Sequence, residues 1–119
     1  SLSYFNCQLG ISMKTINEAI VAFAYMCQEK TNEYYKASLA NLTPPQFIIK
    51  KGSKYSKVIT KGTSESVFCF IDNATGDIFK AASWAAPAKH ARGNIMSHNN
   101  GEEALSYSYG SPSIRYLKF

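Results

Sequence analysis

Apolar and polar positions follow two different periods along the chain. Through residues 13–40 the apolar positions recur at steps of three and four, and charged side chains occupy the other faces. Ser12 precedes this segment and a Pro-Pro pair follows it, which is typical of a helix start and a helix end. The pattern therefore predicts one long amphipathic helix. The positions of its stripe are Ile16, Ile20, Phe23, Cys27, Tyr34 and either Ser38 or Leu39.

Runs rich in β-branched and aromatic residues lie on both sides of this helix. The run before it, at residues 2–9, alternates as a short strand does. After the helix, four runs separated by turn residues predict an antiparallel meander. Their turn at residues 72–77 contains Asn73 and Gly76, which suit positions of positive φ. The four runs are residues 46–51, 54–61, 65–72 and 77–83, and one or two terminal strands follow in residues 104–110 and 113–119.

A second, shorter helix is predicted near residues 86–93. Pro87 suits the first turn of a helix, Ser83 is a candidate cap, and Gly93 suits a left-handed position after the last turn. Together the elements predict an α+β fold in which one long amphipathic helix packs on a mostly antiparallel sheet. At 119 residues the chain is expected to form a single domain over residues 1–119.

The net charge bears on function. The chain has 13 Lys and Arg residues and 8 Asp and Glu residues, which gives a formal net charge of +5. A basic domain favours anionic partners such as nucleic acid. The lysines are densest in the first two predicted strands after the helix, where Lys51, Tyr55, Lys57 and Lys61 share a face if the turn keeps register. The alternative is a solvated edge strand that lysines protect against aggregation. The lysines of this segment are Lys50, Lys51, Lys54, Lys57 and Lys61.

A second candidate binding segment surrounds Trp84, the one tryptophan of the chain. Lys89, His90 and Arg92 follow it, and the intervening alanines allow a backbone or a ligand to approach closely. One interpretation makes Trp84 a stacking platform for a base, with cationic side chains on phosphates. The other places Trp84 in the core and packs the alanines on the sheet. An indole can also bury one face and expose its edge.

The stretch GDIFKAASWAAPAKHARGNI, residues 76–95, resembles a signature in small proteins of tailed bacteriophages. In those proteins a Tyr-rich stretch ending in Tyr-Leu follows the signature, and the segment YGSPSIRYLKF at residues 109–119 is similar in this respect. The resemblance implies a viral origin and a well-defined fold around Trp84, Pro87 and Gly93. It implies no particular activity.

The residues suggest no catalytic or metal site. Cys69, His90 and Asp77 are the types found in a thiol triad, but Cys69 lies in an apolar strand that hides it and raises its pKa. His90 and His98 lack further ligands at zinc spacing. Asp72 and Asp77 lack the alternating oxygen ligands of a calcium loop. We therefore expect a non-enzymatic protein without cofactor or metal.

The cysteines and the hydropathy bear on location. Cys7, Cys27 and Cys69 are odd in number and sit among apolar neighbours, which indicates buried free thiols in a reducing compartment. No apolar run is long enough to span a bilayer, so no membrane contact is expected. With the phage resemblance, this pattern points to the host cytoplasm or a virion.

The sequence thus predicts a small viral protein that binds nucleic acid, preferentially single-stranded DNA or RNA. The predicted contacts are the five lysines of residues 50–61 together with Trp84, Lys89, His90 and Arg92. The alternative is an interaction protein. It would be a homo-oligomer, a virion component, or a phage inhibitor of a host system that acts on a protein or a small nucleotide.

Overall fold

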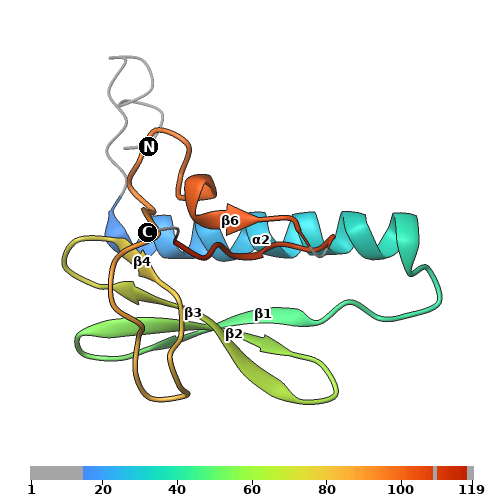
Figure 1. Ribbon diagram of the computed structural model, residues 1–119, viewed down its shortest axis with the longest axis horizontal. Coiled ribbons are helices and arrows are strands. Elements are labelled where there is room, and N and C mark those ends of the chain that lie inside the picture. Colours follow the sequence, from blue (N-terminus) through green and yellow to red (C-terminus); the bar gives the residue numbers. More distant parts are fainter. Residues whose placement is uncertain (1–14, 109, 118–119) are drawn as a thin grey trace.

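One long helix covers one side of a five-stranded antiparallel sheet, so the predicted α+β class is confirmed (Figure 1). The computed structural model describes residues 15–108 and 110–117, and the strand predicted at residues 2–9 lies outside them. The sheet order is β1-β2-β3-β4-β5. The elements are α2 (Ile16–Ser38), β1 (Gln46–Lys51), β2 (Tyr55–Lys61), β3 (Glu65–Asp72), β4 (Asp77–Phe79), β5 (Gly93–Asn94), the 3₁₀ turn η1 (Glu102–Ala104), β6 (Leu105–Ser106) and β7 (Ser113–Ile114).

Helix α2 begins at a capping box, with Thr15 as the cap where the sequence suggested Ser12. The Thr15 hydroxyl accepts from the Glu18 N–H at 3.1 Å, and the Glu18 carboxylate accepts from the Thr15 N–H at 3.2 Å. This reciprocal pair satisfies two of the donors that every helix start leaves open. Among the described residues, no helix has the length and apolar character needed to cross a membrane.

The core lies between α2 and one face of the sheet, which we call the inner face. The helix buries the stripe that contains Phe23 and Cys27, and the sheet supplies Val58, Cys69 and Ile71 to the same cluster. The chain after β5 closes the core with further buried residues. These are Ile95, Ala104, Leu105 and Ile114. The opposite side of β1–β3, which α2 does not cover, is called the outer face.

The hairpin of β1 and β2, here the lysine hairpin, has its register fixed by Asn73. The side chain of Asn73 accepts from the Ser56 hydroxyl at 2.7 Å and donates to the Gly52 carbonyl at 2.8 Å. Its N–H donates to the Lys54 carbonyl at 2.9 Å. Asn73 therefore joins the β1–β2 turn to the β3–β4 turn. The predicted positive φ at Gly76 is confirmed at 83°, whereas the one predicted at Asn73 is wrong.

No helix forms near residues 86–93, and this part of the prediction is wrong. Residues 80–91, here the Trp84 loop, instead make sheet-like contacts: the Ala88 N–H donates to the Lys80 carbonyl at 2.7 Å, and Pro87 bridges Ala81. A helix of about two turns that starts at Pro87 cannot repay its nucleation cost when pairing partners are available nearby. Gly93 lies in β5 opposite Ile78, so the predicted left-handed conformation is wrong as well.

Candidate nucleic-acid interface

The outer face of the lysine hairpin is basic. Lys50 and Lys57 are direct cross-strand partners, and side chains alternate between faces along a strand, so both belong to the outer face. Lys51 points to the inner face, where its ammonium donates to the Asn17 side chain at 2.9 Å. The sequence prediction that Lys51 shares a face with Lys57 and Lys61 is therefore wrong, and Lys50 takes its place.

Trp84 lies against this face and is 47% exposed, so it is not a core residue. The Lys57 ammonium sits 4.8 Å from the centre of the indole and 5.6 Å from the ring of Phe70. Phe70 is buried and packs edge-on with Tyr55 at 5.9 Å. In Figure 1 the loop that follows β4 extends from the sheet on the side away from α2. Because α2 fills the inner face, the indole is left on the outer one.

Lys57 is positioned by these rings. A lysine ammonium within about 6 Å of an aromatic ring is attracted to the ring's negative face. The contact orients the indole and keeps a positive charge beside it. The structure thus joins one lysine of the hairpin to Trp84, as a combined binding surface requires.

The three polar residues after Trp84 do not act together. Lys89 and His90 are exposed, but they follow the hydrogen bond that closes the base of the Trp84 loop, whereas Trp84 lies near its tip. Arg92 is only 8% exposed, and its guanidinium donates to the carbonyls of Lys89, His90 and Arg115. The guanidinium thus links these three carbonyls and cross-links the backbone segments that carry them. The guanidinium is therefore engaged within the fold, and a contact of Arg92 with nucleic acid stays a prediction.

No lysine of the hairpin forms an ion pair with an acidic side chain of the described residues, although Glu65 lies directly opposite Lys61. In the part of the chain that the structure describes, the one ion pair joins Lys30 to Glu102 at 2.9 Å, away from the hairpin. Lys54 lies in the turn, with its ammonium 5.4 Å from the ring of Tyr55. Like charges directly opposite each other in a sheet are destabilising, as at Lys50 and Lys57. A bound polyanion would relieve that repulsion.

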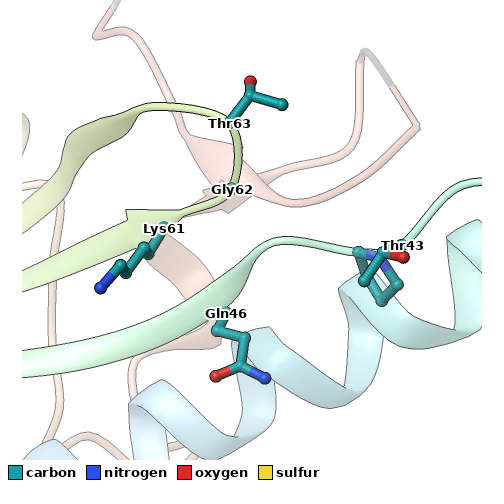
Figure 2. A pocket seen from close by; sticks show the side chains of 6 residues that line it. Thr43, Gln46, Lys61, Gly62 and Thr63 are labelled. Atoms are coloured by element: carbon teal, nitrogen blue, oxygen red, sulfur yellow. The ribbon is translucent and has the colours of Figure 1, made fainter.

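Two of the hollows lined by described residues border the outer face. The larger, of about 500 Å³, lies between the α2–β1 connection and the β2–β3 turn, with Thr43, Pro44, Gln46, Lys61, Gly62 and Thr63 around it. Figure 2 shows the side chains of Lys61 and Thr63 pointing in different directions, so its polar groups do not converge on one point. The smaller, of about 320 Å³, lies beside Trp84.

The candidate thiol triad is not placed for catalysis. Cys69 is fully buried, and burial raises the pKa of its thiol well above the ordinary value, which leaves almost no reactive thiolate. Within residues 15–108 and 110–117, no three His, Cys, Asp or Glu side chains are grouped closely enough to hold a metal ion.

Fold and surface together define a small α+β protein whose helix covers one side of its sheet and whose other side is basic and aromatic. Residues 8–117 match the model of a family of unknown function, DUF7717, and the chain belongs to this family. No curated protein and no solved structure matches the chain. The resemblance of residues 76–95 to phage proteins stays a prediction.

Sequence reasoning missed two features of this surface. Glu65 lines the hollow beside Trp84, but a lone glutamate at a strand start carries no recognisable pattern. Arg115 exchanges hydrogen bonds with Arg92 across 23 positions of sequence, a partnership that no local pattern reveals.

Proposed function

We propose that this protein binds single-stranded nucleic acid, DNA or RNA, on the outer face of its sheet and without catalysing a reaction. The observation that carries the proposal is the half-exposed indole of Trp84, with the Lys57 ammonium 4.8 Å from its ring centre. Lys50 and Lys61 lie on the same outer face of the hairpin. Lys54, in the turn of the hairpin, adds a further phosphate contact in this proposal, and the predicted contacts of Lys89 and His90 stay predictions.

The preference for single strands follows from stacking. An exposed aromatic side chain stacks on the flat face of a base, and each such contact contributes roughly 1–3 kcal/mol. In a duplex those faces are already stacked on neighbouring bases. The lysines act on either form, because they neutralise phosphates and release counterions. Trp84 therefore discriminates between strand forms, and the lysines supply the salt-dependent affinity.

The cellular setting belongs to the same proposal. The resemblance of residues 76–95 to small tailed-phage proteins supports a viral origin, and with it the host cytoplasm or a virion as the place of action. Binding of phage or host single strands would suit either location.

A second candidate, a protein partner or a second copy of the chain, is favoured by one observation. Val21 and Tyr25 lie one turn apart on α2 and are 59% and 66% exposed. Exposed apolar side chains grouped on a surface are typical of interaction sites. Purification distinguishes the two functions: nucleic acid that co-purifies and is released by salt supports the first, and a defined assembly free of nucleic acid supports the second.

The direct test measures binding of a fluorescein-labelled oligothymidylate at several salt concentrations. Lys50→Gln should reduce the slope of log affinity against log salt by about 0.7, the value for one phosphate contact on a single strand. Lys36→Gln removes an equal charge from the end of α2 and should leave the slope unchanged. Trp84→Leu should weaken binding by roughly 1–3 kcal/mol without changing the slope.

The intrinsic fluorescence of Trp84 gives an independent readout, because no other residue of the chain is a tryptophan. Its emission should be quenched as the oligonucleotide saturates the protein. Absence of salt-sensitive binding at low ionic strength would exclude the nucleic-acid function.

A further inference from the structure

The hollow beside Trp84 lies between the start of β3 and the Trp84 loop, and has a volume of about 320 Å³. It is a shallow depression that is open to solvent, of the kind on which a flat group can lie. Trp84 lines it from the loop, and three residues at the start of β3 line it from the sheet. The remaining lining residues are small, which leaves the aromatic wall accessible. They are Ala81, Ala82 and Ser83 of the loop and Ser66 and Val67 of β3, with Glu65 at the strand start.

Glu65 supplies the one charged group among these lining residues. No hydrogen bond or ion pair engages its carboxylate in the described part of the chain, although Lys61 is its cross-strand partner. Ser66 by contrast shares a hydrogen bond of 2.8 Å with Thr60. An ionised carboxylate accepts hydrogen bonds and donates none. The hollow therefore combines a stacking wall with a strong acceptor at its rim.

We infer that this hollow binds a guanine base of the single strand, with the base stacked on Trp84 and its Watson–Crick edge directed at Glu65. The inference rests on the proposed function. Guanine presents two neighbouring donors on that edge, the ring N1–H and the exocyclic amino group, and a carboxylate accepts both in parallel. Adenine and cytosine present an amino group beside an acceptor nitrogen, and thymine and uracil present one N–H between two carbonyls.

The placement of a carboxylate on this surface supports the assignment. A negative charge beside Trp84 repels phosphates, so Glu65 weakens any binding that depends on charge alone. A carboxylate that accepts hydrogen bonds from a base edge instead increases specificity for that base, because charged hydrogen bonds are stronger than neutral ones. Stacking combined with readout of the Watson–Crick edge is the usual mode of single-strand recognition.

The test compares oligothymidylates that are identical except for one central base: guanine, inosine, adenine, cytosine or thymine. Each strand contains at most a single guanine, so the strands do not associate with one another through guanines. We expect the guanine strand to bind about tenfold more tightly than the adenine, cytosine and thymine strands, a ratio that corresponds to one charge-assisted contact. Inosine, which lacks the exocyclic amino group, should fall in between.

Glu65→Gln should reduce the guanine preference to within about twofold, because an amide offers one acceptor and places a donor against the second guanine N–H. Glu29→Gln, which removes the same charge from the exposed side of α2, should preserve the preference. The preference is a ratio of affinities, so partial unfolding of a variant lowers all strands equally and does not alter it.

The outcomes separate the two proposals. Equal affinity for all strands, with binding still weakened by Trp84→Leu, would overturn the guanine inference and leave the proposed function standing. A guanine preference that survives Glu65→Gln would also overturn the inference. Failure of every strand to bind at low ionic strength would overturn both.

Discussion

Arg92 and Arg115 bind each other's backbone. The Arg92 guanidinium donates to the Arg115 carbonyl at 2.9 Å, and the Arg115 guanidinium donates to the Arg92 carbonyl at 2.7 Å. Arg92 also donates to the His90 carbonyl at 3.1 Å, and His90 adopts a left-handed φ of 70°. An unusual backbone conformation persists only where surrounding contacts stabilise it. The two arginines thus attach the last strand to the segment before β5.

Replacement of Arg92 by lysine tests this role. Arg92→Lys keeps the net charge but cannot reproduce the planar fork of donors, so several partly buried carbonyls lose their partner. We expect the free energy of unfolding to fall by about 1.5–3 kcal/mol in a urea titration. Lys89→Ala, at an exposed neighbour, should change it by less than about 0.5 kcal/mol. If Arg92→Lys left the free energy of unfolding unchanged but weakened oligonucleotide binding, Arg92 would be a nucleic-acid contact and not a structural cross-link.

Gly101 is required by both backbone conformation and space. Its φ is +90°, and a Cβ there would lie 2.8 Å from Ile78 Cδ1 and 2.9 Å from Phe23 Cδ1. Gly101→Ala should therefore lower the free energy of unfolding by about 2–4 kcal/mol, through left-handed strain and overpacking. Gly62→Ala is the matched control, since its Cβ would meet only Pro45 at 3.7 Å. Equal thermal midpoints for both variants would contradict this reading of the core.

At the scale of elements, Gln28 joins α2 to β1. Its side chain accepts from the Phe47 N–H at 2.8 Å and donates to the Pro45 carbonyl at 3.0 Å. β1 is an edge strand, and edge strands leave backbone groups open for unwanted pairing. The helix therefore protects the start of this edge with a side chain.

Removal of that side chain should weaken the contact between α2 and β1. Gln28→Ala is expected to lower the free energy of unfolding by about 1–2 kcal/mol, measured by chemical denaturation. Asn32→Ala removes a further partner of Gln28, on the exposed surface of the helix, and should cost less than about 0.5 kcal/mol. A larger loss for Asn32→Ala than for Gln28→Ala would contradict the proposed role of Gln28.

At the scale of the whole molecule, two thiols of the described residues lie in the core: Cys27 of α2 and Cys69 of β3 are both free and completely buried. Burial raises the pKa of Cys27 from 9.0 to about 12 and raises the pKa of Cys69 as well. Because the folded state holds the Cys27 proton more tightly than the unfolded state does, this stabilisation is complete below pH 9.0 and is lost as the pH rises toward about 12. Cys7 lies outside the described residues.

Both thiols should therefore resist alkylation while the protein is folded. In a Cys7→Ser background, iodoacetamide at mildly alkaline pH should modify Cys27 and Cys69 only after denaturant is added, because the thiolate is the reactive form. Mass spectrometry counts the adducts. A disulfide between any two of the three cysteines in protein purified without reductant would contradict the expected reducing compartment.

The sequence by itself determined the elements whose signals are local. Strands β1 and β3 have the predicted limits, residues 46–51 and 65–72, because β-branched and aromatic runs end at turn residues there. Helix α2 follows from its periodic stripe, which is a property of consecutive residues. The clustering of lysines in one hairpin is likewise visible in consecutive residues of the sequence.

Only the tertiary structure decided where the candidate site residues point. Lys50, rather than Lys51, joins Lys57 on the outer face because Asn73 of a later turn fixes the hairpin register. Trp84 stays exposed because α2 has already filled the inner face, and Arg92 is buried because Arg115 supplies a distant carbonyl. Residues 86–93 form no helix for the same reason: their hydrogen-bonding partners come from other segments, and a short segment gains more from those partners than from a helix of its own.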